Sequence, residues 1–219
     1  MTSIQKAFAA EFLGTALLVT ATVGSAIMAA QNSADNGVVL FTVALATGAT
    51  LTLLIHLFAS HSGAHFNPAV SLVMHLKGWL TPSHFALYVI AQITGAIAGA
   101  ALANSMYALS ALKISGNNRY STGNLLGEVV ATAVLVFLIV MLADSRRAHL
   151  IPVAVGAWIA SAILLTSSTS FANPAVTIGR MFTESGAGIS PTSGAWFIGV
   201  QVVSALLGMS VARFFKESE

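Results

Sequence analysis

Long stretches without charge set the pattern of this chain. Asp, Glu, Lys and Arg are absent from 12–34, 36–76, 78–112, 148–179 and 185–212. A membrane-spanning helix needs about 20 mostly apolar residues. These stretches are too long for the strands of a β-barrel and lack their alternation. The pattern predicts six spanning helices at roughly 8–30, 38–59, 84–107, 124–143, 150–168 and 192–213.

Two of the charge-free stretches, 36–76 and 148–179, are longer than one span needs and contain polar segments. One such segment is 60–65, which reads Ser-His-Ser-Gly-Ala-His, and the other is 166–170, which reads Thr-Ser-Ser-Thr-Ser. Non-helical backbone at membrane depth is tolerated only where protein or a water-filled cavity covers it. We therefore expect both segments to belong to re-entrant loops, which enter the membrane and turn back.

The two halves of the chain share short sequence motifs, which occur in the same order in each half. Residues 10–16 match 127–133, 67–70 match 173–176, and Gln92 matches Gln201. Each half then holds three spans and one re-entrant loop. Because three is odd, the second copy must cross the membrane in the opposite sense. This predicts an inverted repeat, about 7–110 and 124–215, within a single domain 1–219, and such repeats build their site near the midplane.

Composition agrees with an all-α integral membrane protein. The chain is 56% hydrophobic and 7% charged, whereas a soluble domain carries about 25% charged residues. This argues against a soluble enzyme, a disordered protein and a nucleic-acid binder. The chain has no cysteine, which excludes disulfides and thiolate metal sites.

The basic residues divide unequally between the two sides of the membrane that these spans imply. Cytoplasmic loops carry an excess of Lys and Arg, so the richer side predicts cytoplasmic N- and C-termini. One side holds Lys6, Lys77, Arg146, Arg147, Arg213 and Lys216, and the other holds Lys113, Arg119 and Arg180.

The repeated Asn-Pro-Ala has a direct structural meaning. Asn is a favoured N-cap and Pro is favoured at the first helical position, so Asn67-Pro68-Ala69 and Asn173-Pro174-Ala175 predict helix starts. About ten residues follow each, enough for half the membrane at 1.5 Å per residue. Two half-helices, 68–77 and 174–183, would then meet at the midplane. Their positive N-termini and asparagine amides would pass neutral hydrogen-bonding solutes and hinder ions.

Two glutamates lie inside predicted spans. A carboxylate there is costly and needs a partner, and re-entrant loops have backbone N–H groups that need acceptors. We expect Glu11 and Glu128 each to accept from a loop, with a proton relay as the alternative. His65 is expected to hydrogen-bond loop backbone. His61 and His65 have metal-like spacing, but Gly63 breaks the helix between them, and we expect no metal or cofactor.

The chain is similar to the aquaporin, or major intrinsic protein, family over nearly its full length. The residues that carry the resemblance are 62–70, 173–175, the paired glutamates and the paired glutamines Gln92 and Gln201. The resemblance implies a right-handed bundle of six tilted helices with two half-helices. It also implies one pore per subunit and a homotetramer in membrane lipid.

The resemblance places the four positions of a selectivity filter at Thr47, Ile163, Ser170 and Val176. Most family members carry Arg directly after the second Asn-Pro-Ala, where this chain has Val176. Losing Arg removes a long side chain, several donors and a positive charge. The filter should therefore be wider, less polar and less repulsive to cations. This resembles a bacterial aquaglyceroporin-like subgroup of arsenic-resistance operons, which implies arsenite permeation and a bacterial inner membrane.

Arg180 lies four residues after Val176. Helical side chains lean toward the helix N-terminus, so its guanidinium could reach the outer pore mouth. An ion pair with Glu184, one turn further on, is the interpretation we favour from sequence.

These features favour a passive channel for small neutral solutes: glycerol-like polyols, arsenite and other metalloid hydroxides, and water. A mainly water-conducting aquaporin is the alternative. A secondary transporter is less favoured, because only Glu11 and Glu128 offer ionisable groups in the core. Nothing indicates a structural junction protein. No nucleophile–base pair or phosphate-binding loop suggests an enzyme.

Overall fold

The computed structural model describes residues 3–215, and these residues form helices without strands. The six long helices are α1 (Ser3–Asn32), α2 (Asn36–Ser62), α4 (Pro82–Met106), α5 (Thr122–Asp144), α6 (Ile151–Leu165) and α8 (Pro191–Phe214). A short 3₁₀ turn, η1 (Ala148–Leu150), precedes α6, and two short helices are α3 (Pro68–Leu76) and α7 (Pro174–Arg180). Each long helix, α6 together with η1, is long and apolar enough to cross a membrane. The predicted all-α fold with six spans is confirmed.

Two predicted boundaries are wrong near the second re-entrant loop. The fifth span was expected to reach 168, but α6 ends at Leu165 because Thr166 is extended, with φ −98° and ψ 142°. The second half-helix was expected to reach 183, but α7 ends at Arg180. The carbonyl of Arg180 accepts from the backbone N–H of Ile189 at 3.1 Å. A long-range bond thus replaces the next helical one.

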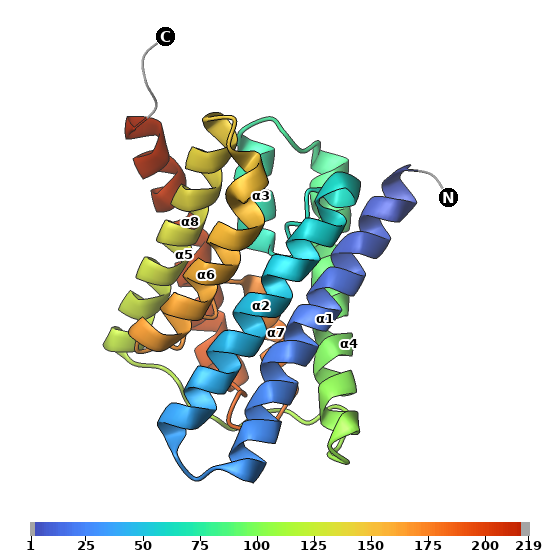
Figure 1. Ribbon diagram of the computed structural model, residues 1–219, viewed down its shortest axis with the longest axis vertical. Coiled ribbons are helices and arrows are strands. Elements are labelled where there is room, and N and C mark those ends of the chain that lie inside the picture. Colours follow the sequence, from blue (N-terminus) through green and yellow to red (C-terminus); the bar gives the residue numbers. More distant parts are fainter. Residues whose placement is uncertain (1–2, 216–219) are drawn as a thin grey trace.

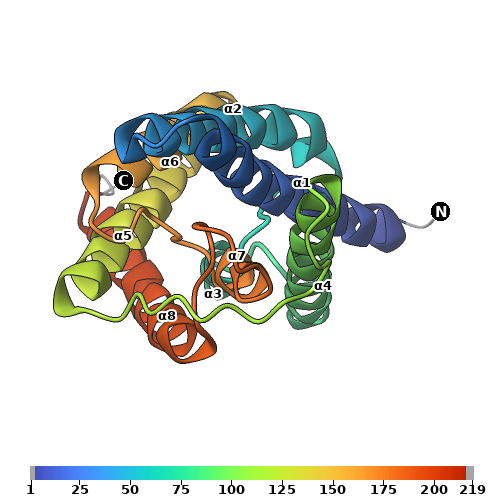
Figure 2. The ribbon, with the colours of Figure 1, turned by 90° about the horizontal axis from the view of Figure 1, so that it is seen from below.

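The long helices form a ring around the two short ones (Figure 2). In the first half α1 packs against α2 and α4, and in the second half α5 packs against α6 and α8. The halves meet through α2 and α6, and the short helices α3 and α7 contact each other inside the ring. The start of α1 and the end of α8 lie at the same end of the bundle (Figure 1).

Glycines let the first and last helices of each half approach closely. A Cβ built on Gly99 of α4 would lie 2.2 Å from the carbonyl oxygen of Ala16 in α1, and one on Gly208 of α8 would lie 2.2 Å from that of Ala133 in α5. Neither position tolerates a side chain without movement of the backbone. Small residues at such crossings are typical of helix packing in lipid.

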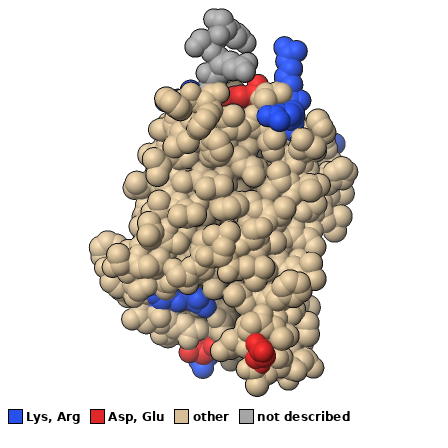
Figure 3. Space-filling view, turned by 60° about the vertical axis from the view of Figure 1, so that its left-hand side comes forward, with Lys and Arg blue, Asp and Glu red and all other residues tan. Residues whose placement is uncertain are grey.

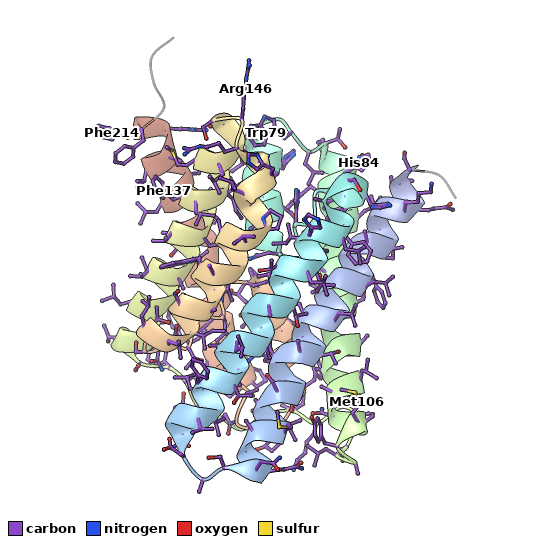
Figure 4. All side chains as sticks on the ribbon, viewed as in Figure 1. Trp79, His84, Met106, Phe137, Arg146 and Phe214 are labelled. Carbon is purple, nitrogen blue, oxygen red and sulfur yellow. The ribbon has the colours of Figure 1, made fainter. Side chains whose placement is uncertain are left out.

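Charge gathers at the two ends of the molecule, and a broad uncharged band lies between them on the face in Figure 3. Trp79 and Arg146 lie at one end and Met106 at the other (Figure 4). Lys77 and Asp144 form an ion pair of 2.9 Å between the end of α3 and the end of α5. Lys216, counted above with the cytoplasmic residues, lies outside the described residues, and the orientation of the termini stays a prediction.

Candidate pore

A cavity of about 820 Å³ runs through the ring of helices. Its lining extends from Ser33, between α1 and α2, and Asn36, at the start of α2, to Trp79 and Ile151 at the other end. One wall is mostly apolar and comes from helices that include α1, α2, α5 and α6. The other wall includes the segments 63–67 and 169–173 and residues of α3 and α7. The cavity therefore has one mostly apolar side and one side rich in hydrogen-bonding groups.

The two re-entrant segments have matched backbone strain. Ala64 and Phe66 have φ values of 52° and 50°, and Ser170 and Ala172 have values of 47° and 48°. Left-handed backbone at residues other than glycine costs of order 1–3 kcal/mol each and persists only where the surroundings enforce it. Both loops therefore need strong external partners.

Glu11 is fully buried beneath the first loop and accepts four hydrogen bonds. The backbone N–H groups of His65 and Phe66 donate at 2.9 and 2.7 Å. Ser62 Oγ donates at 2.6 Å and Gln92 Nε2 at 2.7 Å. All four partners are donors, which suits an ionised carboxylate.

Glu128 occupies the equivalent place under the second loop. Its carboxylate is also fully buried and accepts from the backbone N–H groups of Phe171 at 2.9 Å and Ala172 at 2.8 Å. Gln201 Nε2 donates at 2.7 Å, as Gln92 does to Glu11. The paired glutamines singled out in the sequence thus lie against the paired glutamates.

Each asparagine caps its own half-helix and binds the opposite loop. Asn67 Oδ1 accepts from Ala69 N at 2.9 Å, and Asn173 Oδ1 accepts from Ala175 N at 2.9 Å. Asn67 Nδ2 donates to the carbonyl of Ala172 at 2.8 Å, and Asn173 Nδ2 donates to that of Phe66 at 2.7 Å. We expected both amides to point into the lumen. One N–H of each amide joins the two loops, each amide has a second N–H, and both asparagines line the cavity. Donation into the lumen stays a prediction.

His65 differs from expectation in its ring contact. Its Nδ1 pairs with the hydroxyl of Ser71 at 3.0 Å, not with loop backbone. Ser71 also accepts from Gln92 Nε2 at 2.9 Å. His61, by contrast, pairs with Ser60 at the exposed end of α2. The two histidines are therefore engaged by different partners.

The four expected filter residues come from four different segments, and all line the cavity. Thr47 is on α2, Ile163 on α6, Ser170 in the second loop and Val176 on α7. Their role as a filter stays a prediction. Thr22, which the sequence did not single out, also lines the cavity and shares a hydrogen bond of 3.1 Å with Thr47.

Arg180 lies in the cavity wall, and the favoured pairing with Glu184 is wrong. Its Nε donates to the carbonyl of Ala187 at 2.5 Å, and its guanidinium carbon is 3.4 Å from the ring centroid of Phe171. Glu184 instead accepts from the N–H of Gly116 at 3.2 Å. The spacing rule failed because α7 ends at Arg180, so Glu184 is not on a following helical turn.

Arg119 also lines the cavity, and sequence reasoning missed it. It belongs to the long connection between α4 and α5, which crosses this end of the bundle (Figure 2). Its Nε and Nη2 donate to the carbonyls of Gly188 at 2.8 Å and Gly186 at 2.6 Å. Burial lowers the pKa of the Arg119 guanidinium and the charge of Glu128 opposes that shift. The group stays protonated, as arginine does in proteins.

Comparison with known proteins agrees with this architecture. The sequence model described as "Major intrinsic protein" matches residues 1–172. An aquaglyceroporin, AqpS, of Rhizobium meliloti is 44% identical over 205 residues, which cover 94% of this chain and 88% of that protein. Aquaporin Z of Brucella melitensis is 32% identical over 91% of this chain and 96% of its own length.

Among solved structures, the fold resembles that of the aquaglyceroporin from Plasmodium falciparum. The TM-score is 0.75 at 21% identity, with 97% of this chain and 95% of that chain covered. The fold, the family match and the two full-length relatives agree, and the chain therefore belongs to the major intrinsic protein family of membrane channels.

Proposed function

We propose that this protein is a passive channel for small neutral solutes: glycerol-like polyols, arsenite and other metalloid hydroxides, and water. The observation that supports this most directly is the cavity, in which an apolar wall faces two hydrogen-bonding loops. A polyol presents carbon on one side and hydroxyls on the other, so such a wall pair matches it. The names of two similar proteins, both aquaglyceroporins, point the same way.

Val176 is the residue on which the choice of solute depends. At this position a valine takes less space than an arginine and removes its fixed donors and charge. The filter of Thr47, Ile163, Ser170 and Val176 should then admit molecules larger than water. Arsenite at neutral pH is an uncharged trihydroxide of this kind. A mainly water-selective channel would need a narrower and more polar constriction.

Stopped-flow light scattering of proteoliposomes tests the proposal with osmotic gradients of water, glycerol, urea and arsenite. We expect all four to equilibrate faster than in empty liposomes, and an ionophore to change none of the rates. Water flux alone would support the water-selective alternative. Dependence on an ion gradient would instead indicate a secondary transporter.

The surroundings of the pore fit a subunit in a bilayer. Large apolar side chains are exposed on the outer faces of the helices, including Phe41, Leu45 and Leu53 of α2 and Val203 and Leu207 of α8. We place the protein in a bacterial inner membrane as a homotetramer with cytoplasmic termini. Native mass spectrometry of the detergent-solubilised protein should give the mass of four chains, and a monomer mass in mild detergent would contradict this assembly.

A further inference from the structure

Two arginines stand at the outer end of the pore, beyond position 176. Of the described residues that line the cavity, Arg119 and Arg180 are the only ones among Asp, Glu, Lys and Arg. They come from separate segments, the connection after α4 and the last turn of α7. Both guanidinium carbons approach the ring of Phe171, at 5.5 and 3.4 Å from its centroid. One aromatic ring therefore fixes two positive charges in one region of the wall.

No carboxylate in the described part of the chain neutralises this pair by direct contact. Lys77 and Asp144, at the other end, form the ion pair seen in residues 3–215. Glu128 is a buried acid whose charge acts on both arginines. Its oxygens already bind Phe171, Ala172 and Gln201. Two cations against one engaged anion leave this section of the pore positive.

The acids in the outer segments are also engaged elsewhere. Asp35 caps α2 by accepting from Gly37 and Val38. Glu184 accepts from the N–H of Gly116. Neither side chain lies in the cavity lining. A cation that enters the outer mouth therefore meets fixed positive charge in the pore wall without a facing carboxylate.

The arginines also keep hydrogen-bonding capacity for a solute. An arginine has five N–H donors, and Arg180 gives only its Nε to a protein acceptor within residues 3–215. Its two Nη groups therefore have no protein acceptor there. The Phe171 ring, 3.4 Å from the guanidinium carbon of Arg180, holds this guanidinium group in place. A hydroxyl or carbonyl of a neutral solute can take the place of water on these donors.

We propose that Arg119 and Arg180 form a second selectivity element, one helical turn outside Val176, which rejects cations and donates hydrogen bonds to neutral solutes. Val176 leaves the pore wide at its own position. The positive charge that excludes cations comes from Arg119 and Arg180, which lie nearer the outer mouth. Width and charge selection would thus be separated along the pore. The inference rests on the proposed function, since it concerns the same pore.

Urea and guanidinium provide the test, because both are small planar molecules of similar shape and only guanidinium is charged. Wild-type proteoliposomes should take up urea and exclude guanidinium. Arg180→Met keeps an unbranched stem on Phe171, and Arg119→Gln keeps a donor for a glycine carbonyl. We expect each to raise guanidinium uptake relative to urea uptake about tenfold or more, since a fixed charge a few ångströms from the path is removed, and to slow urea uptake, because a donor to the solute is lost.

Two control variants distinguish the effect of a positive charge in the pore wall from that of a positive charge elsewhere on the surface. Arg180→Lys retains the charge and should keep guanidinium out. Lys113→Met removes an exposed cation that does not line the cavity and should change neither flux. If Arg180→Met does not fold, Arg119→Gln, in a half-exposed loop, carries the test. Continued exclusion of guanidinium by a variant that still passes urea would overturn the inference. Absence of urea flux in the wild type would instead count against the proposed function.

Discussion

Replacing Glu11 with glutamine should weaken the fold around the first re-entrant loop. The four donors to Glu11 divide between its two oxygens: Ser62 Oγ and His65 N bind Oε1, and Phe66 N and Gln92 Nε2 bind Oε2. A glutamine amide turns one acceptor into a donor. With the N–H₂ group at Oε2, the Phe66 N–H and Gln92 Nε2 both lose their acceptor. With the N–H₂ group at Oε1, the His65 N–H loses its acceptor, whereas the Ser62 hydroxyl can turn and accept.

The size of the effect follows from that count. A buried donor without an acceptor costs about 1–3 kcal/mol, so one or two of them predict a loss of about 1–6 kcal/mol in the free energy of unfolding. The backbone groups have no freedom to find other acceptors, because the loop is held in left-handed backbone at Ala64 and Phe66. The apparent melting temperature should fall by roughly 2 °C or more.

Thermal unfolding in detergent, followed by tryptophan fluorescence, measures this loss, and urea flux in liposomes reports on the pore. Glu184→Gln is the matched control, since Glu184 is exposed and accepts a single backbone bond. It should leave the melting temperature nearly unchanged. A Glu11→Gln protein of unaltered stability whose flux had lost its pH response would refute the bracing role and favour a proton relay.

Three further predictions concern packing, the asparagine bridge and the filter. Gly99→Ala places a Cβ against the carbonyl of Ala16 and should cost about 1–3 kcal/mol of stability. Asn173→Ala removes a helix cap worth about 1 kcal/mol and, by orphaning the carbonyl of Phe66, about 1 kcal/mol more; thermal unfolding measures both. Val176→Arg should reduce glycerol flux nearly to that of empty liposomes while water flux persists, as seen by stopped-flow scattering.

Each of the three has a matched control. Gly199→Ala adds a Cβ with no atom within 4 Å and should not destabilise; equal melting temperatures for both glycine variants would contradict the close α1–α4 contact. Asn173→Ser keeps a capping oxygen and is too short to donate to the carbonyl of Phe66, so it should cost about half as much as the alanine variant. Val176→Ala should preserve glycerol flux, and glycerol passage through Val176→Arg would remove this residue from the filter.

The half-helices of the re-entrant loops show which boundaries local sequence can predict and which it cannot. Asn-Pro-Ala predicted where both half-helices begin, at Pro68 and Pro174, because capping and the fixed φ of proline are properties of adjacent residues. The same reasoning misplaced the end of α7. That end depends on a bond between Arg180 and Ile189, and no local signal announces it.

The contacts of Arg119 and Arg180 also could not be predicted from local sequence. The sequence showed that Arg is missing at 176 and present at 180. It favoured a pairing with Glu184 because spacing alone assumes that a helix continues. Arg119, in a loop, had no pattern to distinguish it. Only the fold brings both guanidiniums to the ring of Phe171.

By itself the sequence determined the membrane as the solvent, the six spans and the paired half-helix starts. Each of these follows from hydrophobic run length or from contacts between neighbouring residues. The tertiary structure decided what the polar groups do, since their partners lie far away along the chain. Asn67 binds the carbonyl of Ala172, and Glu11 reaches loop and helix at once. Away from the cavity and from bulk water, each donor must find an acceptor in the protein, and which acceptor it finds depends on the packing of the whole bundle.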